Sequence, residues 1–251
     1  MTVWANITQA IRSRGFIVSA VGTFLAVALG TTGIPTDNAD VIYLLGLSLN
    51  GSSSNILVIC IFSILPFATS FASEWAEGSY RFWVIRTGLR VYTYAKIVVC
   101  AISGFIATFV GITIFLGTFS LLYPLFVSPY VSNSYSIFLE NGQPQLYLLF
   151  FMTHISLSSS IFAVLALFVS SIFQDRFTTV AMPVVIYMAM LRLSELIDPP
   201  AFLNLSVFIE AIYNAGSPPK SILLKLTATI IVIIVLGGLT SMRIRKLVQN
   251  D

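Results

Sequence analysis

The chain has 251 residues, of which 57% are hydrophobic and only 9% are charged, and its mean hydropathy is +0.93. Soluble domains carry about 25% charged residues, so this composition excludes a water-soluble globular protein and predicts an integral membrane protein. The length fits one domain over residues 1–251. The net charge of +3 is unremarkable, and we expect no nucleic-acid partner.

Six apolar stretches are predicted to cross the lipid bilayer as helices. A spanning helix needs about 20 mostly apolar residues to cross a hydrocarbon core about 30 Å thick. In the first stretch Gly22, Ala26 and Gly30 form a row of small residues that permits close helix contact, and Pro66 is expected to bend the second. The predicted fold class is therefore an all-α membrane protein with six transmembrane helices, at residues 16–33, 56–72, 97–123, 146–173, 177–193 and 222–242.

The segments outside these spans differ in kind. Residues 34–55 are polar and rich in Gly, Ser and Asn, and residues 124–145 hold three prolines. Residues 174–176 form a tight turn, which predicts that the fourth and fifth helices are antiparallel neighbours. The apolar segment 201–213 is too short to span, so we expect a short interfacial or re-entrant helix before the last span. Residues 2–14 are weakly amphipathic, which leaves open an interfacial helix and a flexible tail.

The first span could be mistaken for a secretory signal, because two arginines precede it. Its apolar run is longer than the 7–15 residues typical of such signals. We therefore expect it to be retained as a membrane helix.

The distribution of basic residues predicts the orientation. With the N-terminus inside, ten of the 13 Lys and Arg residues lie on the cytoplasmic side, and six of the ten acidic residues lie outside. Cytoplasmic loops are enriched in Lys and Arg, so both termini and the long charged loop at residues 73–96 are predicted to be cytoplasmic. Of the three outer basic residues, Arg192 and Lys225 fall at predicted helix ends, where long side chains can reach the interface.

Motifs for chemistry are few. The chain has no Walker-type phosphate loop, no H-E-x-x-H zinc motif and no G-x-S-x-G nucleophile motif. His154 falls in the fourth span with Ser158 one turn further on, and we favour a structural hydrogen bond over a functional site. Cys60 and Cys100 fit neither a disulfide framework nor a zinc pattern. No acid falls in the middle of a predicted span, so we predict no catalytic or metal-binding residue and disfavour an enzyme.

Residues 73–96 have the pattern of a short helix between two turns. Gly78 permits a sharp change of chain direction. Ser79 is placed to cap a helix over about residues 80–86, and Gly88 is placed to end it. We therefore predict a rigid helical element in this loop.

One face of that short helix is largely aromatic. Tyr80, Trp83, Val84 and Thr87 recur at helical spacing on it. The face could anchor the loop among lipid headgroups, or it could dock into a groove on a cytoplasmic partner. The turns on both sides favour a rigid element, so we favour docking.

The same loop resembles that of a known family. It reads E-x-x-E-G-S at residues 74–79, T-G-x-R at 87–90 and Y-x-K at 94–96. This pattern resembles the loop after the second helix in ABC transporter permeases of the type-2 exporter superfamily, above all the small six-helix permeases of drug or bacteriocin export and self-immunity. Motif-level similarity covers about residues 73–96, whereas the layout of helices is similar over the whole chain. Ser79 stands where threonine is commoner.

The resemblance implies that this helix is a coupling helix. Such permeases work as dimers with two separate ATPase subunits, so ATP and Mg²⁺ bind to the partner chains and this chain needs no cofactor. Closure of the ATPases would tilt the second and third spans and open a path for an amphipathic or hydrophobic substrate such as an antimicrobial peptide, a drug or a lipid. The implied location is a bacterial plasma membrane. The residues expected to contact the ATPase are Glu74, Glu77, Gly78, Ser79, Tyr80, Arg81, Trp83, Val84, Arg86, Gly88, Arg90 and Lys96.

An alternative function stays open. The chain could be a non-transporting membrane sensor or immunity protein that binds a peptide at its outer loops. Such a protein would bind its ligand without dependence on nucleotide.

Overall fold

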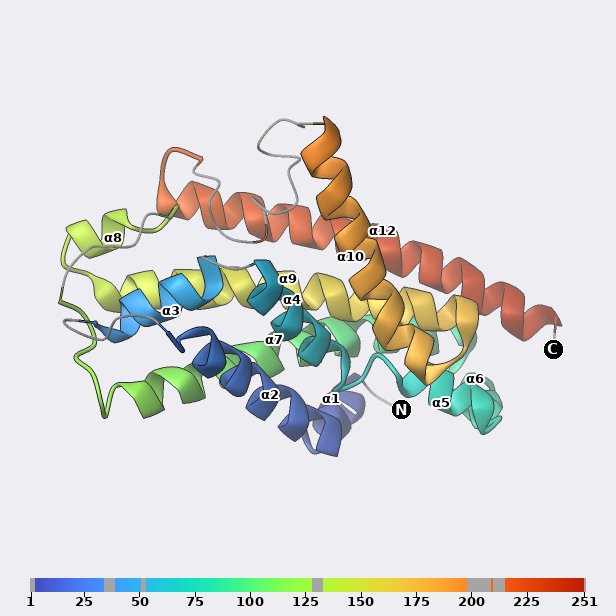
Figure 1. Cartoon of the computed structure of the whole chain (residues 1–251). Coiled ribbons are helices and arrows are strands. Elements are labelled where there is room, and N and C mark those ends of the chain that lie inside the picture. The colour runs from blue at the N-terminus through green and yellow to red at the C-terminus, as the bar shows by residue number, and fades with distance from the viewer. Residues whose placement is uncertain are drawn as a thin grey trace.

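Three long helices run side by side along the molecule (Figure 1): α7 (Leu89–Phe119), α9 (Pro144–Phe173) and α12 (Pro218–Asn250). The computed structural model describes residues 3–33, 39–50, 53–127, 133–197, 209 and 215–250. Within those residues the regular structure is helical, without a strand. Each long helix has at least 30 residues, or about 45 Å at 1.5 Å per residue, which exceeds the thickness of a hydrocarbon core.

Four of the described helices are long and apolar enough to cross a membrane. They are the three long helices and α10 (Arg176–Ile197), which contains Pro183. Most of the α9 span is buried within the protein, whereas most of α10 and α12 faces outward. This arrangement makes α9 the central helix. The all-α prediction is confirmed for the described residues, and four candidate membrane-spanning helices correspond to the last four predicted spans. A total of six spans stays a prediction.

The first two predicted spans are shorter than expected. α2 (Arg14–Gly30) has 17 residues, and α4 (Ser53–Ile64) has 12. The predicted bent helix over residues 56–72 is instead interrupted by turns at residues 65–69 before α5 (Ser70–Ala76) begins. The interruption includes Pro66, which lacks a backbone N–H and clashes with the preceding turn of a helix.

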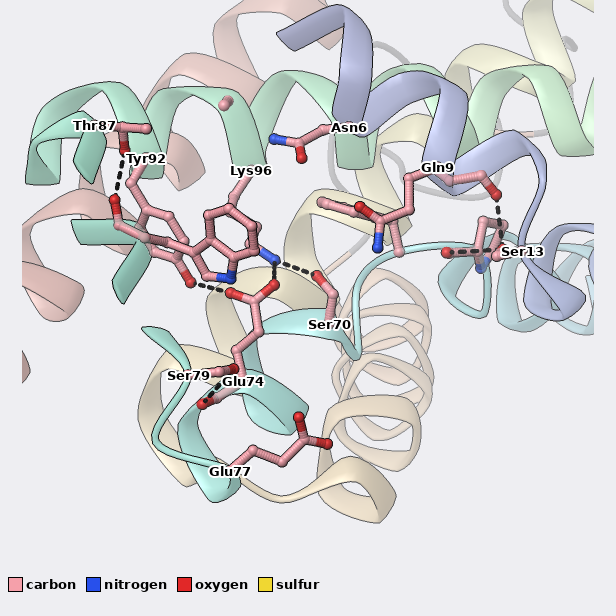
Figure 2. A pocket seen from close by; sticks show the side chains of 15 residues that line it. Asn6, Gln9, Ser13, Ser70, Glu74, Glu77, Ser79, Thr87, Tyr92 and Lys96 are labelled. Carbon is pink, nitrogen blue, oxygen red and sulfur yellow. Dashed lines mark hydrogen bonds and ion pairs between the residues drawn. The ribbon is translucent and has the colours of Figure 1, made fainter. Parts of the chain in front are cut away.

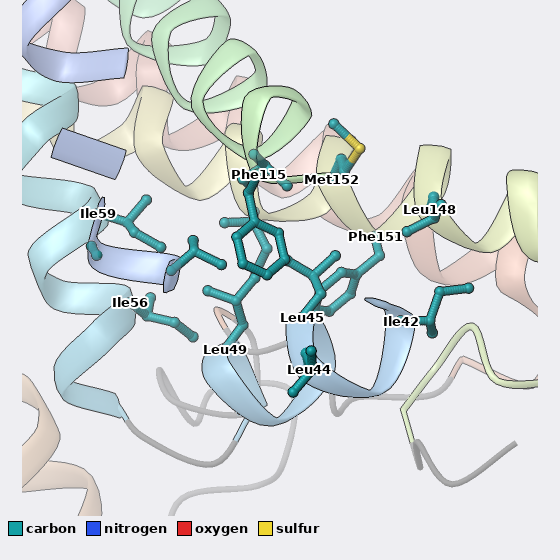
Figure 3. Packing of buried hydrophobic residues seen from close by; sticks show 14 of the residues in the cluster. Ile42, Leu44, Leu45, Leu49, Ile56, Ile59, Phe115, Leu148, Phe151 and Met152 are labelled. Carbon is teal, nitrogen blue, oxygen red and sulfur yellow. The ribbon is translucent and has the colours of Figure 1, made fainter. Parts of the chain in front are cut away.

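The predicted polar connection at residues 34–55 contains a buried helix, α3 (Val41–Asn50). Its apolar side chains pack against α4, α7 and α9 (Figure 3). Asp40 holds the start of this helix, because its carboxylate accepts hydrogen bonds from Tyr43 N at 2.6 Å and Val127 N at 2.7 Å. Because polar residues flank this apolar run on both sides, the overall composition of residues 34–55 did not indicate a buried helix.

Shorter elements close the two ends of the bundle. α1 (Val3–Ile11) is a helix rather than a flexible tail, and its apolar residues pack against the core. α8 (Ile137–Glu140) lies in the connection before α9. The predicted tight turn is confirmed, because Gln174 adopts a left-handed conformation and α9 packs against α10. The predicted re-entrant segment at residues 201–213 lies outside the described residues apart from Ile209, which is buried.

The predicted row of small residues allows close helix contact. A Cβ atom on Gly22 would meet the ring of Phe62 on α4 at 2.4 Å. On α7, a Cβ atom on Gly111 would lie 2.7 Å from the carbonyl oxygen of Ala20 on α2. Side chains at these positions would therefore push α2, α4 and α7 apart.

Buried apolar residues form two clusters at different levels of the bundle. The first lies among α2, α3, α4, α7 and α9. The second joins α1, α5, the start of α7 and the last turns of α12, with Ala10 and Ile244 both in it. We call this second level the α6 end, after the helix α6 (Tyr80–Thr87) that projects there. Both chain ends lie toward it (Figure 1), as the charge pattern requires, while their orientation across a bilayer stays a prediction.

Candidate functional site

The short helix predicted in the charged loop is present. α6 runs from Tyr80 to Thr87, and its neighbours Gly78 and Gly88 have positive φ angles of 68° and 80°. Gly88 N donates to Val84 O at 2.9 Å, which ends the helix where expected. The predicted cap by Ser79 is wrong. Its backbone is already helical, and its hydroxyl donates back to Glu74 O at 3.4 Å.

The aromatic face of α6 points into the protein. Tyr80 is buried and stacks on Trp75 of α5 at 4.4 Å between ring centroids. Trp83 and Val84 pack against the same buried cluster. The aromatic face that we expected to dock on a partner is thus packed against the chain itself, with Tyr80 buried and Trp83 and Val84 half-buried. Docking of this face on a partner stays a prediction.

The outward face of α6 carries other apolar residues. Phe82 is 77% exposed and Ile85 is 84% exposed. Arg81 and Arg86 are exposed as well. These four exposed side chains make up the outward face of α6, and we call them the α6 outer face.

Below α6, a buried ion pair joins α5 to α7. Lys96 Nζ lies 2.5 Å from Glu74 Oε1, and the exposed fractions of the two side chains are 4% and 23%. Lys96 Nζ also donates to Ser70 Oγ at 2.9 Å, and Tyr92 Oη donates to Glu74 Oε2 at 2.6 Å (Figure 2). The ammonium group lies 4.6 Å from the ring centroid of Phe67. Lys96, predicted to contact a partner, is therefore internal, and Glu74, predicted likewise, is half-buried beside it.

A cavity of about 420 Å³ lies beside this ion pair. α1 covers it with Asn6 and Gln9, while α5, α6 and α7 supply the other walls (Figure 2). Its lining mixes hydroxyl, amide, carboxylate and ammonium groups with aromatic rings. The full lining is Asn6, Gln9, Ala10, Ser13, Pro66, Phe67, Ser70, Glu74, Glu77, Ser79, Trp83, Thr87, Tyr92, Ala95 and Lys96.

The remaining predicted contact residues lie at the surface. Glu77 is exposed, and its Oε1 atom lies 3.8 Å from Nη2 of Arg176, the first residue of α10. Arg90 is exposed at the start of α7. The turn next to Arg176 is stabilised by Asp175, which accepts from Thr178 N at 2.8 Å. This hydrogen bond lowers the pKa of the Asp175 carboxyl below its usual value.

A second buried polar group lies between α9 and α12, and sequence reasoning missed it. Lys225 is fully buried, and its Nζ atom donates to Ser158 Oγ at 2.8 Å. The prediction that Lys225 reaches an outer interface is wrong. α12 begins at Pro218, about one turn earlier than expected, so position 225 lies within the helix and faces α9. The sequence pattern that could have revealed this contact is a row of polar residues at i, i+4 and i+8, formed by Ser221, Lys225 and Thr229. All three are buried in the structure.

His154 makes a hydrogen bond with a tyrosine, whereas we had expected the serine one turn further on. It is buried on α9, and its Nδ1 atom lies 2.8 Å from Tyr135 Oη. Burial raises the pKa of Tyr135 above its ordinary value, so the phenol stays neutral. The pair joins α9 to the segment that precedes α8.

Neither buried polar group has the ligands of a metal centre. Among the residues that the structure describes, no cluster of three or more His, Cys, Asp or Glu side chains could hold a metal ion. Comparisons of the chain with known protein families, with curated proteins and with solved structures find no match.

Proposed function

We propose that this chain is the membrane permease subunit of an ATP-driven exporter of the ABC type, powered by separate ATPase subunits that dock on the α6 outer face. The observation that supports this best is the position of α6. It projects from one end of a bundle of apolar helices, and glycines with positive φ angles bracket it. Its exposed Phe82 and Ile85 offer apolar anchors flanked by arginines.

The contacts beneath α6 support a role in transmitting force. Stacking of Tyr80 on Trp75 fixes α6 to α5. The Glu74–Lys96 ion pair then joins α5 to α7, and α7 packs along the central helix α9. A partner that pushes α6 would therefore move α5 and α7 together. In this proposal the α6 end faces the cytoplasm, in agreement with the charge distribution.

The proposed substrate is amphipathic or hydrophobic: a peptide, a drug or a lipid. Transport would require a second permease copy, identical or related, in a bacterial plasma membrane. ATP and Mg²⁺ would bind to the ATPase subunits alone.

Co-purification of this chain with candidate ABC ATPases co-expressed from the same genome tests the proposal. The variant Phe82→Ser with Ile85→Ser removes both apolar anchors and is expected to lose the ATPase and the ATP-dependent transport. Leu121→Ser is the matched control, because Leu121 is 85% exposed beyond the far end of α7. This control should keep the complex.

Two results would overturn the proposal. One is that no ATPase co-purifies with the wild-type chain. The other is that the double variant keeps full ATP-dependent transport. Peptide binding by the chain alone, unaffected by nucleotide, would instead support a sensor or immunity protein.

A further inference from the structure

A second cavity lies between the start of α7 and the last turns of α12. Its volume is about 420 Å³, and it shares no lining residue with the cavity beside the Glu74–Lys96 pair. Two arginines from different helices, Arg90 and Arg245, face the same space. The other lining residues are Gly88, Leu89, Val91 and Ser241.

The packing of α7 against α12 explains where this cavity lies. The helices approach closely at Gly237, where a Cβ atom would lie 3.2 Å from Ile97. Val91 precedes that contact by six residues on α7, and Arg245 follows it by eight residues on α12, which are about 9 Å and 12 Å along the two helix axes. Ile244 near the end of α12 is fully buried and belongs to the second apolar cluster, against which Leu89 of α7 also packs. Arg245 therefore lies at the rim of a fixed contact.

The groups around this cavity are those that bind an anion. Arg90 and Arg245 are exposed, and within the described residues the ion pairs use other partners, so neither guanidinium is neutralised by a described acid. α7 begins here, and Gly88 gives it no side-chain cap. The backbone N–H groups of a first helical turn lack partners within the helix and favour negative charge. Guanidinium groups bind phosphate oxygens through two parallel hydrogen bonds.

The surroundings of the cavity indicate a lipid rather than a soluble anion. Val91 is exposed on the first turn of α7, and Leu239 and Met242 are exposed on α12 beside Ser241. Both helices are long enough to cross a membrane. The arginines therefore lie where an apolar, outward-facing surface ends, which is the position of a lipid headgroup whose acyl chains cover that surface. Basic cavities between membrane helices bind anionic headgroups in this way.

We propose that this cavity binds the phosphate group of an anionic phospholipid, held by Arg90 and Arg245. The proposal needs the helices to lie in a bilayer, but it does not depend on the transport function proposed above. It assigns Arg90 to a lipid instead of an ATPase partner.

The test measures binding of a fluorescent phosphatidylglycerol to the purified full-length chain in neutral detergent micelles. Arg90→Gln with Arg245→Gln is expected to weaken binding at least about tenfold, because charge-assisted hydrogen bonds to phosphate are lost. Arg90→Lys with Arg245→Lys keeps the charge without the planar fork, and its affinity should fall between wild type and the glutamine variant. Arg243→Gln is the matched control, because Arg243 is exposed on the same helix and does not line the cavity.

Several outcomes would overturn the proposal. Unchanged phosphatidylglycerol binding by the glutamine variant would do so, if this variant elutes as a folded species in size-exclusion chromatography. An equal loss in Arg243→Gln would show a general effect of net charge. Equal binding of phosphatidylcholine would show that the anionic headgroup is not recognised. Displacement by inorganic phosphate at the concentration at which unlabelled phosphatidylglycerol competes would assign the site to a soluble anion.

Discussion

Two buried lysines occupy matching positions in their helices but have different surroundings. Lys96 lies seven residues after the start of α7, and Lys225 lies seven residues after the start of α12. The first lies at the α6 end and contacts a carboxylate, a hydroxyl group and two aromatic rings beside a cavity. The second is fully buried and donates to the hydroxyl of Ser158 on the central helix.

The difference shows that a buried ammonium group can serve two structural purposes in one bundle. The Glu74–Lys96 pair connects the two helices on either side of α6, so it lies on the path by which a push on α6 would reach α7. Lys225 instead fixes α12 to α9, far from α6 along the bundle. An ionisable residue within membrane helices is costly and is therefore a candidate for function. The substitutions below separate the two environments.

The largest effect is expected from Glu74→Ala. This change leaves the Lys96 ammonium group buried without its carboxylate, and breaking a buried ion pair in this way costs about 3–5 kcal/mol. The free energy of unfolding, measured by titration with SDS in mixed micelles, should fall by that amount. Adding Lys96→Met should restore most of the loss, because the unpaired charge is then gone. A loss below about 1 kcal/mol, typical of a surface pair, would contradict a structural role for the ion pair.

The next largest losses in the free energy of unfolding are expected when the serine that contacts each lysine is replaced by alanine. Ser158→Ala removes the hydroxyl that accepts from Lys225, and hydrogen bonds to charged groups contribute about 1.5–3 kcal/mol. Ser70→Ala removes the matching hydroxyl beside Lys96, but that lysine keeps Glu74, so the loss should be smaller. The same titration compares the two variants. Equal losses would show that the carboxylate does not compensate for the missing hydroxyl.

A moderate effect is expected from Tyr92→Phe. The phenol donates to Glu74 Oε2 at 2.6 Å, and its removal leaves that oxygen with one partner fewer. Because Glu74 keeps Lys96, we expect a loss of about 1.5 kcal/mol, at the low end for a hydrogen bond to a charged group. In the Glu74→Ala background the tyrosine has no carboxylate to bind, so adding Tyr92→Phe there should have little further effect. Additive losses would separate the tyrosine from the ion pair.

The smallest effect is expected from Glu77→Gln, three residues from Glu74. Glu77 and Arg176 are both about two-thirds exposed, and their charged atoms are 3.8 Å apart. Exposed ion pairs contribute about 0–1 kcal/mol and are screened by salt. Thermal unfolding of this variant should therefore match wild type at high salt. A loss as large as that of Glu74→Ala would mean that the stabilising acid had been assigned to the wrong residue.

Much of the fold follows from the sequence, because apolar length is a direct requirement of the bilayer. The last four spans were predicted near their observed positions. Their helices begin earlier than predicted, as with α7, which starts at Leu89 rather than at 97. Hydropathy locates only the apolar part of a helix. The first turns of α7 contain the exposed Arg90 and the paired Lys96, so hydropathy placed the start of this helix too late.

The contacts of the candidate site were not predictable from the sequence. Helical spacing identified the apolar face of α6 but not the surface that covers it, which is formed by α5 and α7. Glu74 and Lys96 are separated by 22 residues, and no local period links residues at that distance. The polar row that contains Lys225 was visible as an i, i+4 pattern, but it required a helix that begins before the apolar run.

The shortness of α2 has a consequence for the surrounding lipids. Its outward apolar side chains extend from Ile17 to Leu29, about 18 Å along the axis, whereas those of α12 extend from Leu223 to Met242, about 28 Å. The two faces therefore differ in hydrophobic thickness by about 10 Å. A bilayer adapts to such a mismatch by compressing its acyl chains beside the shorter face. The protein is expected to thin the membrane on its α2 side only, so its surface is asymmetric toward lipid.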